Sequence, residues 1–426
     1  MKYRSIKGTA DILPQNLGGS VELRQIVEAN AKAIFRNFAY NEIRTPIIEE
    51  KALFVKSIGD ETDIVKKEMF TFKDRGERDI ALRPEGTAPI IRAYLENNIY
   101  KTSPFQKFYY IGPMFRAERP QAGRMRQFHQ IGLEAIGSDS PALDAEVIEV
   151  FIRILDSSGI KNYRLKINNL GCREDKKRLS KIIKDTFSKK GVSGGLCDDC
   201  KRRLKDNPLR VLDCKNENCK TAVKLYLKSP EFLCQDCKVH FDEVLKFLNL
   251  AKIGYTVDPY IVRGLDYYTR TVFEVTHHSL GAQDAIGAGG RYDNLVSDMG
   301  GPKTGAVGFA LGVERLLMVS AKDAAMFKGE KAVCVYIATL GKAAYEKGFT
   351  VAGELRNNLI SCDLEYENKS LKSQMRSADR LGARLVLIIG EDEIARGEAT
   401  LRDMKTKEQT GVKFDEITRR IKERIG

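Results

Sequence analysis

The chain has 426 residues, enough for two or three domains, and its 42% hydrophobic and 30% charged residues are typical of a globular protein rather than a disordered or fibrous one. Its net charge of +13 is typical of proteins that bind polyanions. No apolar run approaches the roughly 20 residues that span a bilayer, and residues 1–14 lack the apolar centre of a signal peptide. We therefore expect a cytoplasmic protein with no membrane partner.

The first predicted elements are a long helix over residues 20–38 and a strand over residues 42–48. Leu23, Val27 and Ile34 follow helical spacing, and the pattern then becomes extended. Pro46 lies inside the predicted strand. Because proline cannot donate a hydrogen bond to a sheet, we expect this strand at a sheet edge or at an interface.

Residues 105–116 and 127–137 are predicted to form an antiparallel pair of strands, joined by a polar loop at residues 119–126. Side chains alternate between the two faces of a strand. The ligand-facing set is Gln130, Gly132 and Glu134, and the core-facing set is Ile131, Leu133 and Ala135. Gly132 is expected to leave space for a ligand lying on the sheet.

The pattern farther along the chain predicts a strand over residues 260–276, a glycine-rich stretch over 281–308 and a helix over 307–319. In that helix Gly308, Gly312 and Arg315 would share one face. Because glycine destabilises a helix, two glycines on one face indicate close approach by a neighbour or a ligand.

The last hundred residues predict a small α/β domain. Apolar strands at residues 333–338 and 385–389 alternate with helical patterns at 343–359 and 370–381. A domain boundary is expected near Gly329.

Four segments far apart in the sequence combine arginine with carboxylate or amide groups. They are RPEGT (83–87), RAER (116–119), QIGLE (130–134) and RGLDYY (263–268). The planar guanidinium of arginine binds phosphate oxygens in pairs and keeps its charge, so the substrate is expected to be phosphorylated. For any single arginine, an ordinary salt bridge is the alternative.

Taken together, these segments resemble the motifs of class II aminoacyl-tRNA synthetases, and the resemblance narrows to the histidyl-tRNA synthetase family. The helix with the Pro46 strand resembles the first class motif. FRAE (115–118) with its loop and strand resembles the second, and residues 305–315 resemble the third. RGLDYYT (263–269) and AGGRYD (288–293) resemble the histidine-specific signatures.

The resemblance implies an α+β fold, with an antiparallel sheet flanked by helices. The catalytic domain would span residues 1–325, with an inserted basic, Cys-rich subdomain at 172–255. An α/β anticodon-binding domain would span residues 330–426. The family is homodimeric, which would place the Pro46 strand near the interface.

The resemblance also implies an activity. L-Histidine and ATP, which carries Mg²⁺, would react to histidyl-adenylate and pyrophosphate, and histidine would then pass to the 3′ end of tRNA(His); DNA would not be a partner. ATP-binding roles fall to Arg116, Glu118 and Arg315, and catalytic roles to Arg263 and Arg116. Histidine-binding roles fall to Glu85, Thr87, Gln130, Glu134, Tyr268 and Tyr292. For the two tyrosines, core packing with a hydrogen-bonded hydroxyl is the alternative.

The polar loop carries three arginines, Arg119, Arg124 and Arg126. Phosphates and an exposed guanine edge both suit arginine, so we expect these residues to reach the acceptor end of the tRNA. A solvated loop without a nucleic-acid contact is the alternative.

The insertion contains two CxxC knuckles. Cys197 with Cys200 and Cys234 with Cys237 would supply four thiolates to one structural zinc ion. The 33 residues between the knuckles exceed the usual spacing, so reduced thiols are the alternative. Residues 172–252 carry 20 basic and 12 acidic side chains, which predicts that the insertion contacts the acceptor arm of the tRNA.

Two other functions compete with this one. A synthetase-like regulatory subunit of ATP phosphoribosyltransferase would resemble the catalytic domain without charging tRNA. Such relatives typically lack the C-terminal domain and catalytic arginines, both of which this chain keeps. A general basic RNA-binding protein would explain the charge but not the pocket residues.

Overall fold

The computed structural model describes residues 3–14, 20–60, 62–121, 123–189, 195–227, 231–281, 284–320, 333–367 and 369–425. It forms two compact units, one containing Leu23–Met326 and the other Phe327–Gly426. The short N-terminal stretch Met1–Ile12 belongs to the first unit, and Leu13–Glu22 to the second. The boundary expected near Gly329 lies outside the described residues. No described helix is long and apolar enough to cross a membrane.

The first unit is built on an eight-stranded sheet in the order β1-β5-β6-β11-β10-β9-β7-β8. Its strands are β1 (Asn41–Glu42), β5 (Gln106–Phe115), β6 (Gln127–Ile136), β7 (Arg164–Asn169), β8 (Thr256–Val257), β9 (Thr269–Thr276), β10 (Ala285–Arg291) and β11 (Ala306–Gly312). From β5 to β7 along the sheet, each strand is antiparallel to its neighbour. The edge strand β1 pairs in parallel with β5, and the edge strand β8 pairs in parallel with β7. The expected pair β5 and β6 is therefore confirmed.

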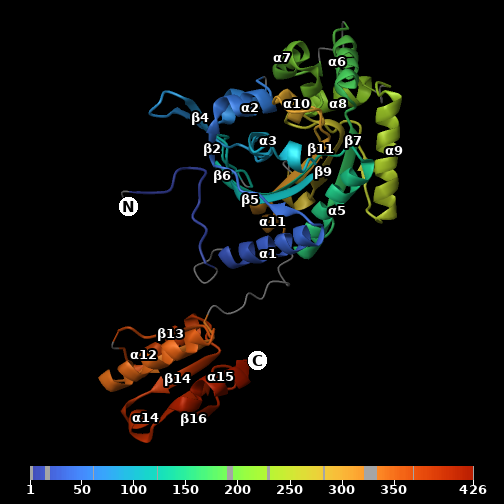
Figure 1. Ribbon diagram of the computed structural model, residues 1–426. Coiled ribbons are helices and arrows are strands. Elements are labelled where there is room, and N and C mark those ends of the chain that lie inside the picture. The colour runs from blue at the N-terminus through green and yellow to red at the C-terminus, as the bar shows by residue number, and fades with distance from the viewer. Residues whose placement is uncertain are drawn as a thin grey trace. The chain divides into compact units, whose positions relative to one another are not determined.

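Helices cover one face of this sheet. They are α1 (Val21–Asn37), α5 (Pro141–Ser157), α9 (Gln235–Leu250) and α11 (Val313–Ser320). Phe35 of α1, Leu133 of β6 and Phe151 of α5 belong to one buried core between helices and sheet. Figure 1 shows α1 and α5 on this side of the sheet and α3 (Thr87–Glu96) on the other. The expected helix over residues 20–38 is α1, and the apolar face of β6 lies in the core as predicted.

The strand expected over residues 42–48 is divided in two. β1 ends at Glu42, and β2 (Ile48–Glu50) belongs to a separate three-stranded sheet with β3 (Thr71–Lys73) and β4 (Asp79–Leu82). The backbone oxygens of Thr45 and Pro46 instead accept hydrogen bonds from Nη1 of Arg83, at 3.0 and 3.4 Å. Pro46 has no N–H to donate to a sheet, and the buried guanidinium of Arg83 satisfies these carbonyls in place of a strand partner.

The predicted helix over residues 307–319 is wrong in its first half. β11 occupies Ala306–Gly312, between β6 and β10, and α11 begins only at Val313. Gly308 pairs with Glu134 on one side and Gly290 on the other. The strand predicted over residues 260–276 is also shorter, since β9 begins at Thr269.

The insertion is a helical subdomain with its own small core. It contains α6 (Arg173–Phe187), α7 (Asp198–Asp206), a 3-10 turn at Pro208–Val211, α8 (Glu217–Tyr226) and α9. Cys200, Cys214 and Cys219 are buried in this core together with Phe187 and Val223. Two short helices, α2 (Lys51–Ile58) and α10 (Leu295–Asp298), lie near α3, and α4 (Ile99–Thr102) follows it.

The second unit is an α/β domain with a five-stranded sheet in the order β13-β12-β14-β15-β16. β12 (Val335–Thr339), α12 (Lys342–Asn357), α13 (Leu371–Arg380) and β14 (Leu385–Ile389) confirm the predicted alternation. The structure adds β13 (Cys362–Leu364), α14 (Glu391–Arg396), β15 (Glu398–Asp403), β16 (Gln409–Lys413) and α15 (Ile417–Ile425). The fold is thus mixed α+β with a helical insertion and a C-terminal α/β domain, as expected.

Candidate active site

The open face of the eight-stranded sheet carries a cavity of about 420 Å³. β5, β6, β9, β10 and β11 form its floor, and segments 85–87, 116–125 and 262–268 form its walls. A volume of this size holds a small organic ligand. Polar and charged side chains dominate the lining, which indicates a ligand with charged groups.

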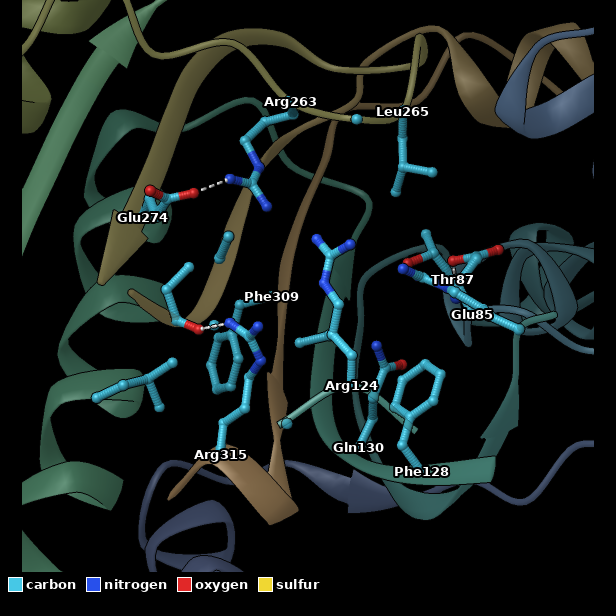
Figure 2. A pocket seen from close by; sticks show the side chains of 18 of the residues that line it. Glu85, Thr87, Arg124, Phe128, Gln130, Arg263, Leu265, Glu274, Phe309 and Arg315 are labelled. Atoms are coloured by element: carbon cyan, nitrogen blue, oxygen red, sulfur yellow. Dashed lines mark hydrogen bonds and ion pairs between the residues drawn. The ribbon is translucent and has the colours of Figure 1, made fainter. Parts of the chain in front are cut away.

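Three arginines from distant parts of the sequence line this cavity. Arg116 follows β5, Arg263 precedes β9, and Arg315 lies in the first turn of α11. Figure 2 shows Arg263 and Arg315 directed into one space from opposite sides, with Arg124 between them. Guanidinium groups directed into one space repel one another, and an anion bound between them offsets this repulsion. The structure therefore brings together the guanidinium groups that the sequence places up to 199 positions apart.

Arg263 is held by a carboxylate behind it. Its Nη1 donates to Oε2 of Glu274 on β9 at 2.6 Å. Although burial opposes the charged form, the Glu274 carboxylate raises the pKa of Arg263 above its ordinary value. Arg263 is thus a fixed cation, oriented from one side and open to the cavity on the other.

Arg116 forms no ion pair with any carboxylate in the described ranges. Its Nε donates to the backbone oxygen of Pro84 at 3.0 Å, and its guanidinium lies 5.4 Å from the ring centroid of Phe128. A salt bridge, which was the alternative for this residue, is therefore not what places it. Its charge remains available to a ligand.

Arg124 lies inside the cavity and not at the outer surface of its loop. Its Nη1 donates to Oε2 of Glu118 at 2.8 Å. Nε of Arg315 donates to the backbone oxygen of Gly123 at 3.0 Å, so the loop lies against α11. Burial and the nearby Arg124 charge lower the pKa of Arg315. Arg124 and Arg315 thus bring positive charge to this end of the cavity, beside the Glu118 carboxylate.

The other end of the cavity is acidic. Oε1 of Glu134 accepts a hydrogen bond from the Thr87 hydroxyl at 2.7 Å, and Oε2 accepts one from the Tyr292 hydroxyl. Burial raises the pKa of Glu134 to about 8, against the two hydrogen bonds, which lower it, and the Glu85 charge adds to the rise. Such a strongly shifted carboxyl in a cavity indicates a functional site.

Glu85 lies beside it at the start of α3. Its two carboxylate oxygens accept the backbone N–H groups of Thr87 and Ala88, at 2.7 and 2.9 Å. These N–H groups have no partner within the helix, so the carboxylate caps the helix. Burial nevertheless raises the pKa of Glu85. A cationic ligand group between the two carboxyls would stabilise both as anions.

Several buried polar atoms in the cavity have no hydrogen-bond partner in the described part of the chain. They are Oε1 of Gln130, the hydroxyl of Tyr110 and Nε of Arg263. Leaving a buried donor or acceptor unpaired costs about 1–3 kcal/mol. Their convergence indicates that a ligand with both donors and acceptors completes the site.

Two glycines on the cavity floor make room for protein groups. A Cβ on Gly308 would lie 2.0 Å from Oε2 of Glu134. A Cβ on Gly132 would lie 2.2 Å from Cζ of Tyr110. The space expected above Gly132 for a ligand is thus filled by the ring of Tyr110, whose residue is its partner on β5.

Two family models match the chain. The model for histidyl-tRNA synthetase matches residues 8–316, and the model for an anticodon binding domain matches residues 334–424. The chain belongs to the histidyl-tRNA synthetase family. The histidine–tRNA ligase of Thermodesulfovibrio yellowstonii is 48% identical over 99% of both chains, and that of Halothermothrix orenii is 47% identical over 97% of both. The crystal structure of apo S. aureus histidyl-tRNA synthetase matches with a TM-score of 0.81 and 33% identity, covering 99% of this chain and 100% of that one.

Most residues singled out by the family resemblance line this one cavity. They are Glu85, Thr87, Arg116, Glu118, Arg124, Gln130, Glu134, Arg263, Tyr268, Tyr292 and Arg315. Arg119 and Arg126 do not line it; Arg119 is exposed, and Nε of Arg126 donates to the backbone oxygen of Glu118 at 3.4 Å.

Other residues that line this cavity had no role assigned to them from the sequence. Tyr110, Tyr267, Glu274, Asp213 and Lys215 also line the cavity. Tyr110 is opposite Gly132 in the predicted strand pair, so strand register could have found it. Asp213 and Lys215 come from the insertion, and no local pattern connects them to the sheet.

The two CxxC knuckles do not form one cluster. Cys197 and Cys200 lie with Cys214 and Cys219, whereas Cys234 and Cys237 lie with Cys172 and Asp175. The predicted four-ligand set is therefore corrected by the structure. The physical reason is that each knuckle begins its own helix, α7 or α9, and meets a different partner segment.

Proposed function

We propose that this protein is a histidine–tRNA ligase that works in two steps at this cavity. In the first, the carboxylate of L-histidine attacks the α-phosphorus of ATP, and histidyl-adenylate forms as pyrophosphate leaves. In the second, histidine passes to the 3′ end of tRNA(His), and AMP leaves. The observation that carries the proposal is the convergence of Arg116, Arg263 and Arg315 beside the Glu134 wall, in a chain of this family.

The arginines would stabilise the charge that accumulates at phosphorus. Arg116 is assigned to the α-phosphate and Arg315 to the γ-phosphate of ATP. Arg263 would lie between the histidine carboxylate and the α-phosphate, where its ion pair with Glu274 fixes its position in advance. Preorganised cations of this kind lower the barrier because they need no reorientation as the charge develops.

ATP enters with Mg²⁺, which neutralises phosphate charge when bound. Oxygen ligands are what this ion prefers, and Glu118, Asp213 and Asp284 supply carboxylates to the cavity wall. Glu118 is assigned to the ATP end because its carboxylate also holds Arg124. The positive cluster of Arg124 and Arg315 would then face the triphosphate.

The acidic end would bind histidine. Glu85, Thr87 and Gln130 are assigned to the α-ammonium group, and the unpaired Oε1 of Gln130 supports this role. Glu134 would accept one imidazole N–H, and Tyr268 would contact the other ring nitrogen, with Tyr292 closing the pocket. A substrate without the imidazole nitrogens would leave these buried groups unpaired, which explains selectivity without a proofreading domain.

Contacts with tRNA are assigned to three regions. The anticodon-binding domain, residues 330–426, would bind the anticodon, in line with its family match. Arg119, Arg124 and Arg126 of the loop would reach the acceptor end, and the insertion at residues 172–255 would contact the acceptor arm. Arg124 would serve ATP and the acceptor end in turn, since it already lies in the cavity.

The enzyme is proposed to act in the cytoplasm as a homodimer, with structural zinc in its insertion. Ile48 of β2 and Phe72 of β3 are 55% and 47% exposed, and both lie on one face of the small sheet next to Pro46. Exposed apolar residues on the same face of a small sheet suit a dimer surface. Sedimentation should give twice the 47.9 kDa chain mass, and Ile48→Asp should lower it toward a single chain.

Histidine-dependent exchange of pyrophosphate into ATP tests the proposed reaction. The ligase should catalyse exchange without tRNA, and omission of histidine should abolish it. A regulatory subunit that only binds histidine would show no exchange at any histidine concentration. Charging of tRNA(His), measured in parallel, reports the second step separately.

A further inference from the structure

We infer that the insertion holds two separate zinc ions rather than one. The first is bound by Cys197, Cys200, Cys214 and Cys219, and the second by Cys172, Asp175, Cys234 and Cys237. The proposed function includes structural zinc in the insertion, and we now add the number of zinc ions and the residues that bind them. This inference does not depend on the catalytic activity, because metal content is measured without turnover.

The first cluster has the dimensions of a tetrathiolate site. Its four sulfur atoms all lie within 4.8 Å of one another, and Sγ of Cys197 is 3.8 Å from Sγ of Cys214. Four sulfurs bound at about 2.3 Å around one zinc stand roughly 3.8 Å apart. A disulfide would need about 2.05 Å between the two sulfurs. The nine cysteines, all of them described, form no disulfide.

The backbone around this cluster also favours thiolates. The N–H of Cys197 donates to Sγ of Cys219 at 3.1 Å. Cys197 precedes α7 and Cys234 precedes α9, with nearly the same backbone angles, φ −67° and ψ 163° against φ −72° and ψ 163°. The two knuckles are therefore the same local structure used twice, each with its second cysteine buried.

The second cluster combines three sulfurs with one carboxylate. Asp175 is fully buried, and its oxygens accept the backbone N–H groups of Cys172 and Cys234, at 3.2 and 3.0 Å. A buried carboxylate is costly unless it is paired or bound to a metal. Arg178 provides one partner from the outer side. Thiolates and carboxylates both bind zinc, and with four protein ligands this site would be closed to water.

Both clusters adjoin residues that hold the wall of the active site. Arg210, between the second and third cysteines of the first cluster, donates from Nη2 to the backbone oxygen of Gly264 at 2.7 Å. Lys176, next to Asp175, donates to the backbone oxygens of Asp266 and Tyr268, at 2.7 and 2.8 Å. The two metals would thus brace residues 263–268 from two sides.

Metal content of the full-length protein tests the inference. Protein purified without chelator should contain two zinc ions per chain by mass spectrometry. Cys214→Ser and Cys237→Ser should each remove one ion, and the double variant should remove both. Cys334→Ser is the matched control, because this cysteine lies outside both clusters and should leave two ions bound.

Cobalt provides a readout that does not depend on how well a variant folds. Wild-type protein freed of zinc should bind two Co²⁺ ions, with the absorption bands of tetrahedral thiolate sites. Removal of the metals should also speed amide exchange in residues 263–268 and leave residues 333–367 unchanged. Failure of wild-type protein to bind zinc or cobalt, or binding of a single ion, would overturn the inference. Full zinc content in Cys214→Ser would do the same for the ligand set.

Discussion

Histidine binding should release a proton from Glu134, because burial keeps this carboxyl protonated at neutral pH. Its pKa is raised to about 8, mainly by burial. At pH 7 about nine-tenths of the carboxyls are then protonated, and the charged carboxylate that we propose as the acceptor for an imidazole N–H forms by loss of that proton. Binding should therefore release about 0.9 proton per site at pH 7. Since ionisation grows as pH rises toward 8, histidine affinity should increase about fivefold between pH 7 and 8.

Calorimetry at pH 7 in two buffers with different ionisation enthalpies measures this proton release. Glu134→Gln keeps an acceptor for Thr87 and Tyr292 but has no proton to lose. The proton release of this variant should fall close to zero. Its affinity for histidine should be weakened about tenfold or more by loss of the charge, and it should hardly change from pH 7 to 8. Glu118→Gln, at the other end of the cavity, is the control and should release protons as wild type does. A wild-type release near zero would show that Glu134 is already ionised before histidine binds.

Three further substitutions follow from the geometry. Arg263→Ala should lower the rate of adenylate formation about 10²–10³-fold with a smaller change in ATP KM, measured by pyrophosphate exchange; an equal loss in ATP binding would show a ground-state role only. Arg315→Ala should have the opposite effect and raise the KM for ATP about 10–100-fold with kcat less affected, because it removes a charge-assisted hydrogen bond to ATP. Gly308→Ala should destabilise the first unit by about 1–3 kcal/mol and weaken histidine binding, because its Cβ would collide with Glu134. The control for Gly308→Ala is Gly353→Ala, which has nothing within 4 Å of its Cβ and should leave histidine KM unchanged and denaturant stability unchanged or slightly higher.

Local periodicity predicted the strand that carries the acidic end of the cavity. The alternation in residues 130–135 placed Gln130 and Glu134 on the cavity face of β6, where they lie. The chain around Gly308 was predicted as a helix because its spacing of three and four looks helical. Backbone pairing with Gly290 and Glu134 holds Gly308 in a strand, and such long-range pairing leaves no signal in the local sequence.

Residues that reach the site from distant parts of the sequence were harder to predict. Lys215 and Asp213 reach the cavity from the insertion, 48 or more positions before Arg263 in the sequence. The grouping of the cysteines failed for the same reason, since the CxxC pattern defines each knuckle but not its partner. Asp175 carries no pattern of its own, and only its burial beside Cys172 and Cys234 reveals it.

A crystal structure with L-histidine and a non-hydrolysable ATP analogue would show directly whether both substrates bind in this cavity. We expect the imidazole beside Glu134, the α-phosphate within hydrogen-bond distance of Arg116 and Arg263, and the γ-phosphate at Arg315. Electron density for the nucleotide away from these three guanidinium groups, or histidine bound outside the Glu134 wall, would contradict this expectation.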